Sequence, residues 1–429
     1  MKISSWGRLS ADSPSIITLD NRHSVKSKMP LPESAIAFGM GRSYGDVCTN
    51  ADGSLILTQQ LNHFISFNTE TGILTCEAGV LLRDIQRLAV PNGWMLAVTP
   101  GTQIVTLGGA IANDVHGKNH HVLGTFCDHV RNIKLVRSNG DLIECNRNQH
   151  ADWFRATAGG LGLTGIIVEA TIQLRRVNGA ALNTQTIPFN NVQEFFSLAT
   201  ESEQSWEYTV AWVDCMSSES RGIFMRANHA IDSTAKASGA NRNMPFTPPF
   251  SLVNAFTLKP FNSFYFHLHK WNAGNAVSHY EPFFYPLDNL SNWNRIYGPR
   301  GFYQYQCVIP EAVAEEAIKA MLALIKRSGT GSFLAVLKKF GEKSPAGMLS
   351  FPMPGTTLAL DFPNKEAKTH ELFNQLDNIL MEAGGRIYCA KDARMPRTLF
   401  EKSYPRIEEF LQYRDPHLSS SMSRRLFGY

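Results

Sequence analysis

Near its amino terminus the chain reads Phe38-Gly39-Met40-Gly41-Arg42-Ser43-Tyr44-Gly45-Asp46, directly after the short apolar run at residues 36–38. Such a run between turn residues is typical of a strand. Three glycines within seven residues let the backbone approach a ligand closely and turn its amides inward, which favours an anion-binding loop. A tight turn without a ligand has the same composition, so this segment is weak evidence by itself.

A second surface of small residues follows at Thr106-Leu107-Gly108-Gly109-Ala110-Ile111-Ala112-Asn113-Asp114-Val115-His116-Gly117. Its glycines and alanines form a face along which a dinucleotide could lie flat. Between the two segments, residues 55–57 and 73–76 are predicted to be strands. Residues 81–89 have the apolar spacing of a helix, which Pro91-Asn92-Gly93 ends.

The segment Gly160-Leu161-Gly162-Leu163-Thr164-Gly165 matches the GxGxxG dinucleotide pattern letter by letter. In a nicotinamide-binding βαβ unit a helix opens at this pattern, so that its amino-terminal amides meet the pyrophosphate. Here a β-branched strand opens instead, at residues 166–174. A nicotinamide-binding Rossmann domain is therefore excluded. The chain also has no GxxxxGK(S/T) loop, which excludes P-loop phosphoryl transfer.

From about residue 180 to residue 385 the character of the sequence changes. Residues 302–310 alternate, with Gln304 and Gln306 on one face of a predicted strand. Two helices and two further strands are predicted at residues 313–329, 372–385, 333–340 and 357–362. This order predicts a mixed sheet with helices on one face. A last strand at residues 386–390 and the tail after it belong with the first domain, so the second domain is expected to be inserted. No internal repeat is evident.

Residues 245–286 hold twelve of the forty-five aromatic residues of the chain, with Glu281 as the only acid. Pro248, Pro249 and Pro260 are expected to break any long regular element in this segment. One interpretation is a buried hairpin layer. The other is a mobile aromatic lid that dips into a lipid headgroup region or covers a lipid-tailed substrate.

The composition of the whole chain excludes several classes of protein. Its 429 residues fit two or three domains, and 43% hydrophobic with 18% charged residues exclude a disordered or fibrous chain. A formal net charge of +4 is too small to indicate a nucleic-acid partner. Seven scattered cysteines without CxxC spacing indicate a reducing compartment. No secretory signal or membrane-spanning run is found, so any membrane contact is expected to be peripheral.

Taken together, the glycine-rich segments resemble the FAD-binding domain of the vanillyl-alcohol-oxidase-type (PCMH-type) flavoproteins. Three motifs carry this likeness: GRSYGD at residues 41–46, PGT with TLGGAIANDVHGKNHH at 100–121, and GGLGLTGII at 159–167. Within that superfamily the chain most resembles the oxidases of the decaprenylphosphoryl-β-D-ribose 2′-epimerases. Here the likeness adds FYQYQ at 302–306, YCAKD at 388–392 and MSRRL at 422–426.

The resemblance implies an α+β fold of two domains. An FAD-binding domain is formed by residues 1–178 and completed by residues 386–429. A mixed-sheet substrate-binding domain is inserted at residues 179–385, and the aromatic, mobile segment at about 245–286 belongs to it.

The implied cofactor is non-covalent FAD, although some members of the superfamily bond their flavin to a histidine. Glycine amides would neutralise pyrophosphate charge, and the phenol ring of Tyr388 would pack beside the isoalloxazine. Carried over residue by residue, the FAD contacts fall on Ala37, Phe38, Gly39, Met40, Gly41, Arg42, Ser43, Tyr44, Gly45, Asp46, Val47, Gly101, Thr106, Leu107, Gly108, Gly109, Asn113, Asp114, Val115, His116, Ile167 and Tyr388.

Oxidation of a sugar carbinol needs an acceptor for the hydroxyl proton and a C–H bond held close to the flavin. Lys391 is the candidate acceptor, because a lysine desolvated beside a flavin has a lowered pKa. The resemblance adds Tyr44, His116 and Lys118, of which His116 and Lys118 would bind the substrate phosphate and position the sugar. The rest of the substrate pocket is implied to include Trp212, Gln306, Lys338, Thr357 and Ala359.

A metal site is not predicted. His116, His120 and His121 are close in sequence, but Gly117 argues against a helix that carries them as ligands, and no carboxylate or cysteine completes a site. Two positions depart from the family pattern. Ala359 stands where relatives carry a reactive cysteine, and Phe284 stands where they carry a tyrosine.

The implied function is oxidation of the 2′-hydroxyl of a polyprenyl-phosphoryl-β-D-ribose to the 2′-keto sugar. This is the first half of epimerisation to the arabinose donor for cell-wall arabinan, with an NAD(P)H-dependent reductase as partner and a quinone or O2 as electron acceptor. Two alternatives stay open: a lactone oxidase acting on a soluble sugar, and a flavin-binding scaffold without catalysis. The expected location is the cytoplasmic face of the inner membrane, with the periplasmic face as the alternative.

Overall fold

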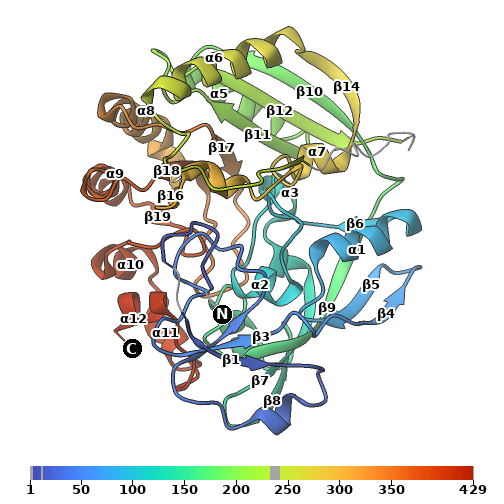
Figure 1. Ribbon diagram of the computed structural model, residues 1–429. Coiled ribbons are helices and arrows are strands. Elements are labelled where there is room, and N and C mark those ends of the chain that lie inside the picture. Colours follow the sequence, from blue (N-terminus) through green and yellow to red (C-terminus); the bar gives the residue numbers. More distant parts are fainter. Residues whose placement is uncertain (1–2, 11–12, 232–241, 429) are drawn as a thin grey trace.

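The computed structural model describes residues 3–10, 13–231 and 242–428, which form two bodies with a cavity between them (Figure 1). The lower body in Figure 1 contains a parallel sheet of strand order β1-β3-β2 and an antiparallel sheet of order β4-β5-β9-β7-β8, with β6 paired to β9. Its strands are β1 (Ser15–Thr18), β2 (Ala35–Phe38), β3 (Ser54–Leu57), β4 (Phe64–Asn68), β5 (Ile73–Glu77), β6 (Trp94–Leu96), β7 (Val130–Val136), β8 (Leu142–Cys145) and β9 (Ile166–Arg176).

Short helices connect these strands; 3-10 helices are labelled η. They are η1 (Val25–Lys28), α1 (Leu82–Ala89), η2 (Val90–Asn92), α2 (Leu107–Ala112), α3 (His120–Leu123), η3 (Phe126–His129) and α4 (Ala151–Thr157). The helix predicted at residues 81–89 is α1, which buries Leu82, Ile85 and Ala89. Gly93 ends the helical segment at a φ of +78°, a conformation that suits glycine. Strand β9 belongs to two hydrophobic cores, one on each face, which explains the continuous apolar run at residues 166–168; beyond it the apolar residues alternate.

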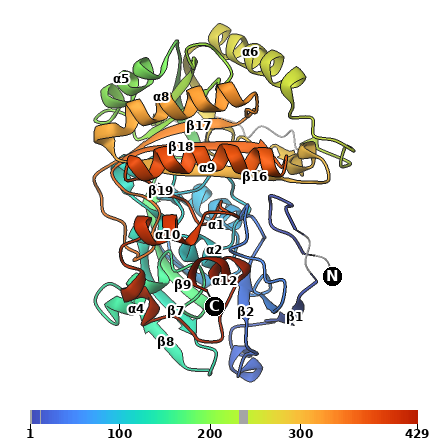
Figure 2. The ribbon, with the colours of Figure 1, turned by 90° about the vertical axis from the view of Figure 1, so that its left-hand side faces the viewer.

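The carboxyl end of the chain returns to this first body. The backbone N–H of Ala35 donates to the carbonyl of His417 at 2.9 Å, and the N–H of Ser419 donates to the carbonyl of Ala35 at 2.8 Å. The last helices, α10 (Arg397–Ser403), α11 (Ile407–Leu411) and α12 (Ser421–Phe427), lie in the same body (Figure 2). The first body is therefore built from both ends of the chain.

The second body is formed around one eight-stranded sheet of order β14-β10-β12-β11-β17-β18-β16-β19. Its strands are β10 (Ala181–Phe189), β11 (Tyr208–Val213), β12 (Gly222–His229), β14 (Gly274–His279), β16 (Phe302–Ile309), β17 (Ala335–Phe340), β18 (Gly355–Pro363) and β19 (Arg386–Ile387). Its helices are α5 (Val192–Ser202), α6 (Ala255–Trp271), α7 (Tyr280–Phe284), η4 (Trp293–Tyr297), α8 (Glu311–Ser328) and α9 (Ala367–Glu382). Strands β13 (Arg242–Asn243) and β15 (Leu290–Ser291) form a separate parallel pair.

The mixed sheet predicted from sequence is wrong in detail, because every described pairing in the eight-stranded sheet is antiparallel. Helix α8 does connect β16 to β17, as the strand–helix–strand order suggests. However, β18 lies between these two strands and pairs with both of them. β16 and β17 are therefore parallel to each other, but they do not pair, because β18 lies between them. Helices α5, α8 and α9 pack against one face of the sheet, as expected.

The eight-stranded sheet contains a structural repeat that the sequence does not reveal. Strands β10, β11, β12 and β14 have the order 4-1-3-2, counted from the edge strand β14, and β16 to β19 have the same order counted from β19. Both sets have the strand order of a split βαβ arrangement. In the second set α8 and α9 lie on one face, whereas in the first set α6 packs on the face opposite to α5. The two sets join edge to edge where β11 pairs with β17 at Ala211–Leu337 and Trp212–Val336.

The last strand pairs with a different body from the one that the sequence suggests. A strand is predicted at residues 386–390 as part of the first body. The structure instead has the short β19 paired with β16 at the edge of the second sheet. β19 also contacts the first body, because the hydroxyl of Tyr404 at the end of α10 donates to the carbonyl of Ile387 at 2.6 Å. Beyond β19, the carbonyl of Ala390 accepts from the N–H of Tyr44 at 3.1 Å.

About half of the aromatic segment at residues 245–286 is helical, in α6 and α7, so a hairpin layer is not what forms there. Helix α6 runs for 17 residues and contains Pro260, which the sequence analysis treated as a break. A proline at this position removes one hydrogen bond to the carbonyl of Phe256. Phe256 is 91% exposed, so the missing bond lies on the solvent side of α6, and the helix continues through Pro260. The inner side of α6 packs on Trp212 and Ile223 through Phe266.

Candidate active site

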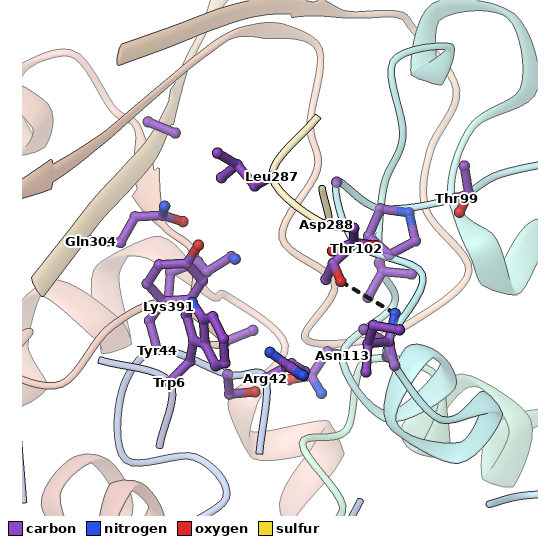
Figure 3. A pocket seen from close by; sticks show the side chains of 18 of the residues that line it. Trp6, Arg42, Tyr44, Thr99, Thr102, Asn113, Leu287, Asp288, Gln304 and Lys391 are labelled. Atoms are coloured by element: carbon purple, nitrogen blue, oxygen red, sulfur yellow. Dashed lines mark hydrogen bonds between the residues drawn. The ribbon is translucent and has the colours of Figure 1, made fainter. Parts of the chain in front are cut away.

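A cavity of about 1040 Å³ lies between the face of the eight-stranded sheet that α5, α8 and α9 leave uncovered and the two glycine-rich segments. The sheet lines it with alternate residues of neighbouring strands: Trp212 of β11, Val336 and Lys338 of β17, Ala359 of β18, and Gln304 and Gln306 of β16. Figure 3 shows the lower part of the cavity, with Lys391, Tyr44 and Trp6 grouped on one side and Asn113, Thr102 and Thr99 on the other.

Most of the predicted FAD contacts border this cavity. These are Ala37, Gly39, Met40, Gly41, Arg42, Ser43, Tyr44, Val47, Gly101, Thr106, Gly108, Gly109, Asn113, Val115, His116, Ile167 and Tyr388. These residues come from four places in the chain and meet at the cavity wall. The side chain of Thr106 caps α2 by accepting from the N–H of Gly109 at 3.2 Å, which holds the second glycine-rich segment in place.

The remaining five predicted contacts, Phe38, Gly45, Asp46, Leu107 and Asp114, do not line the cavity. Asp46 forms an ion pair with Arg425 of α12 at 2.7 Å. Asp114 accepts from the N–H of Cys127 at 3.0 Å and from Ser350 at 2.5 Å. A Cβ on Gly45 would overlap the carbonyl of Asp392, so this glycine permits close packing of two backbones.

The cavity wall fits a bound FAD. A Cβ added to Gly101 would meet no atom within 4 Å, so this backbone borders open space. Oδ1 of Asn113 and Nδ1 of His116 are buried without a hydrogen-bond partner in the described part of the chain. Unpaired buried polar atoms are costly, and a ligand with polar edges would supply their partners.

Lys391 follows β19 and points into the cavity with its amine above Tyr44. Its Nζ lies 3.8 Å from the centroid of the Tyr44 ring. Burial lowers the pKa of Lys391 to about 7; the Asp361 carboxylate opposes this shift, and Lys338 adds to it. An ion pair of Lys391 with Asp392, the alternative for an ordinary surface lysine, does not form, because Asp392 pairs with Arg425 at 2.9 Å.

Asp361 of β18 lies fully buried behind the Lys391 side of the cavity. Its Oδ1 accepts from Nε2 of Gln304 at 2.5 Å, and no described residue donates to Oδ2. Burial raises the pKa of Asp361 to about 7, against the lowering effects of Gln304 and Lys391. When Asp361 is ionised, its charge raises the pKa of Lys391, so a proton stays on the amine to a higher pH than burial alone would allow.

Two more lysines reach the cavity. Burial lowers the pKa of Lys118 to about 7 and that of Lys338 to about 8. The Nζ of Lys118 donates to the carbonyls of Phe283 and, at 3.0 Å, of Phe284. Its hydrogens are thus largely used within the protein, which makes Lys118 a weaker phosphate ligand than the sequence suggests.

His116 is held as a neutral ring. Its Nε2 accepts from Nε2 of Gln306 at 3.0 Å, and the ring packs against Phe340 and Tyr388 with centroids 5.0 and 5.2 Å away. Burial and the charge of Lys338 lower the pKa of His116 well below its usual value. A neutral His116 orients Gln306 but supplies no positive charge to a phosphate.

The other predicted substrate contacts divide into two groups. Trp212 lines the cavity as a wall, with its Nε1 donating to the carbonyl of Phe333 at 2.9 Å. Ala359 also lines it and offers no thiol. Thr357 lies behind this layer, buried, where its Oγ1 accepts from Gln306 at 3.4 Å.

Sequence reasoning assigned no role to Gln304 or Asp361. The alternation of residues 302–306 already placed Gln304 on the face of Gln306, and Asp361 lies two residues from Ala359 on one strand face. The pairing of β16 with β18, in which Gln304 stands opposite Asp361, could not be read from either segment alone.

Comparisons with known proteins bear on the cofactor and the class of reaction. Residues 32–146 match the model of the FAD binding domain family. Decaprenylphosphoryl-beta-D-ribose oxidase of Mycolicibacterium smegmatis is 36% identical over 99% of this chain and 97% of its own length. L-gulonolactone oxidase of Bos taurus is 25% identical over 88% of this chain and 84% of its own length. The predicted FAD cofactor, oxidoreductase class and two-domain α+β fold are thereby confirmed.

Proposed function

The chain belongs to the family of the decaprenylphosphoryl-β-D-ribose oxidases, and from this membership we propose that it oxidises the 2′-hydroxyl of a polyprenyl-phosphoryl-β-D-ribose to the 2′-keto sugar. The observation that carries the proposal is Lys391, a buried amine with a pKa of about 7 at the wall of the FAD cavity. The FAD that binds there supplies the acceptor for the hydride from the carbinol carbon.

Lys391 and the residues around it accept the proton that the reaction releases and stabilise its charge. As the C–H electron pair leaves the carbinol carbon, the O–H bond breaks and its proton passes to Nζ of Lys391. Tyr44 lies beneath the amine and Asp361 stabilises the ammonium that forms. Trp212 forms a flat wall for the sugar, and Lys338 brings a positive charge near it.

A lactone oxidase acting on a soluble sugar is the second candidate, supported by the weaker likeness to L-gulonolactone oxidase. Absorbance of the flavin under anaerobic conditions separates the two. Short-chain prenyl-phosphoryl ribose should bleach the flavin band and yield a 2′-keto product by mass spectrometry. Bleaching by free lactones alone would favour the second candidate, and no bleaching with any sugar would leave a flavin-binding scaffold.

The further partners follow from the chemistry of the product. A 2′-keto sugar needs a separate NAD(P)H-dependent reductase to give the arabinose epimer, and the reduced flavin needs a quinone or O2 to accept its electrons. Both partners and the non-covalent attachment of FAD are parts of this proposal.

We also propose that the enzyme docks peripherally on a membrane through α6 and the segment before it. Five aromatic side chains project from this region into solvent: Phe246, Phe250, Phe256, Phe264 and Trp271, here called the aromatic surface. Exposed Lys259 and Lys270 flank it on α6. Aromatic and cationic residues together suit a headgroup region. Within the described ranges, no helix is both long and apolar enough to span a bilayer.

A further inference from the structure

A second cavity, of about 610 Å³, lies on the other side of the first glycine-rich segment. It shares Trp6, Met40, Gly41, Arg42 and Asn292 with the active-site cavity. Three arginines border it, Arg8, Arg42 and Arg295, and we call it the arginine cavity. Nothing in the proposed oxidation uses Arg8 or Arg295.

Three separate segments build this cavity. The N–H of Trp6 donates to the carbonyl of Ser43 at 2.8 Å, which ties the amino terminus to the glycine-rich loop. Nδ2 of Asn294 donates to the carbonyl of Trp6 at 3.0 Å. Nη1 of Arg295 donates to the carbonyls of Met244 and Pro245, at 2.9 Å each. Arg295 is therefore held by backbone carbonyls, and the guanidinium of Arg42 lies over the Trp6 ring, 4.1 Å from its centroid.

The positive charge of the arginine cavity is only partly compensated. No carboxylate lines it among the described residues. Burial lowers the pKa of Arg42, and Asp288 lies close enough to that guanidinium to oppose the shift, whereas the pKa of Arg8 responds to burial and to Arg295 alone. Nη1 of Arg8 and Nε of Arg42 are buried without a hydrogen-bond partner. Burial and the neighbouring Arg295 lower the pKa of Arg8. Buried charges of one sign are costly unless an anion pairs with them.

The rim of the arginine cavity is apolar on one side. Phe246 lines it and is 64% exposed, and it belongs to the aromatic surface. An anion with an apolar tail would place its charge on the arginines and its tail along Phe246 and Phe250. The guanidinium fork matches phosphate geometry.

We propose that the arginine cavity binds the phosphate group of a membrane amphiphile, with its acyl or prenyl tail on the aromatic surface. The placement of the tail rests on the proposed membrane docking. The anion site rests only on the three arginines. The group bound here does not touch the reacting atoms. Tyr44, Trp293 and Trp6 form a chain of ring contacts, at 6.4 and 5.7 Å, between Lys391 and the arginines.

Titration calorimetry of the FAD-loaded full chain tests the site, with soluble dihexanoyl phosphatidate and inorganic phosphate as probes. We expect phosphatidate to bind more tightly than inorganic phosphate. Arg8→Gln and Arg295→Gln should each raise the phosphatidate Kd about tenfold or more, because each removes a charge-assisted hydrogen bond. Arg8→Lys, which keeps the charge, should lie between. The control Arg300→Gln removes a solvent-exposed arginine paired with Glu366 and should leave the Kd unchanged.

Steady-state kinetics of the Gln variants with the substrate distinguish the two sources of the phosphate. A raised KM for short-chain prenyl-phosphoryl ribose at unchanged kcat would assign the cavity to the phosphate of the substrate. An unchanged KM with weakened phosphatidate binding would assign it to a membrane phospholipid. Equal Kd values for phosphatidate in the wild type and both Gln variants would overturn the proposal, as would inorganic phosphate binding as tightly as phosphatidate. Because binding is measured without turnover, a failure here is separate from a failure of the proposed oxidation.

Discussion

At the scale of single residues, Lys391 decides the pH dependence of the reaction. Only the neutral amine accepts a proton, so kcat should rise with pH through the pKa of about 7 and level off above it. Lys391→Ala should keep the flavin absorbance and lower kcat about 10²–10⁴-fold. Single-turnover flavin reduction measured across pH checks both statements. Near-normal reduction in the variant would show that another group takes the proton.

Asp361 should set the position of this pH profile. Its negative charge raises the pKa of Lys391, so Asp361→Asn should lower that pKa and move the rising limb of kcat to lower pH. Asp361→Glu retains the charge and should leave the limb closer to its original position. Loss of activity with an unmoved limb would mean that Asp361 acts only by packing. Flavin content, measured alongside, separates this from misfolding.

At the scale of elements, helix α12 fastens the glycine-rich loop to the active-site lysine loop. Arg425 bridges Asp46 and the buried Asp392, at 2.7 and 2.9 Å. Arg425→Ala would leave both carboxylates without their partner, which should cost about 3 kcal/mol of unfolding free energy. Urea denaturation followed by flavin release measures it. The exposed pair Arg406–Glu409 supplies the control, since Arg406→Ala should cost less than about 1 kcal/mol.

Sequence patterns predicted the helices and strands that are stabilised by their own apolar spacing. The apolar spacing of residues 81–89 and the β-branched run at 166–174 became α1 and β9 because burial follows directly from those periods. Helix α6 was missed because proline disfavours a helix interior, whereas the cap at Asn254 and the packing of Phe266 stabilise this helix across Pro260. The two-residue β19 was misplaced because its pairing with β16 depends on a strand about eighty residues earlier in the sequence, at 302–309.

At the scale of the whole molecule, the aromatic surface predicts that the enzyme binds to membranes. Phe256→Ser with Trp271→Ser should lower co-sedimentation with liposomes of anionic phospholipid several-fold while flavin content stays unchanged, since both side chains are about 90% exposed. The matched control is Val313→Ser on α8, which is 41% exposed in another part of the second body. Equal sedimentation of the double variant and the wild type would contradict the docking proposal.

The whole-molecule arrangement was only partly accessible from sequence. The glycine-rich motifs and their resemblance indicated an FAD domain made from both chain ends, which the Ala35–His417 hydrogen bond now illustrates. The duplicated strand order stayed hidden, because topology repeats here without a repeated pattern of residues. The ion pair of Asp46 with Arg425 joins positions 379 residues apart, and only the folded chain shows that this aspartate holds a helix instead of lining the cavity.

The junction between the two halves of the large sheet has a mechanical consequence. Two residue pairs join β11 to β17, whereas eight pairs join β10 to β12 and eight join β16 to β18. Few paired residues lower the local cost of separating two strands. Trp212 and Val336, which pair across the junction, both border the substrate cavity. A change in the angle between the two halves would therefore change the width of the substrate pocket while the strand pairing inside each half stayed intact.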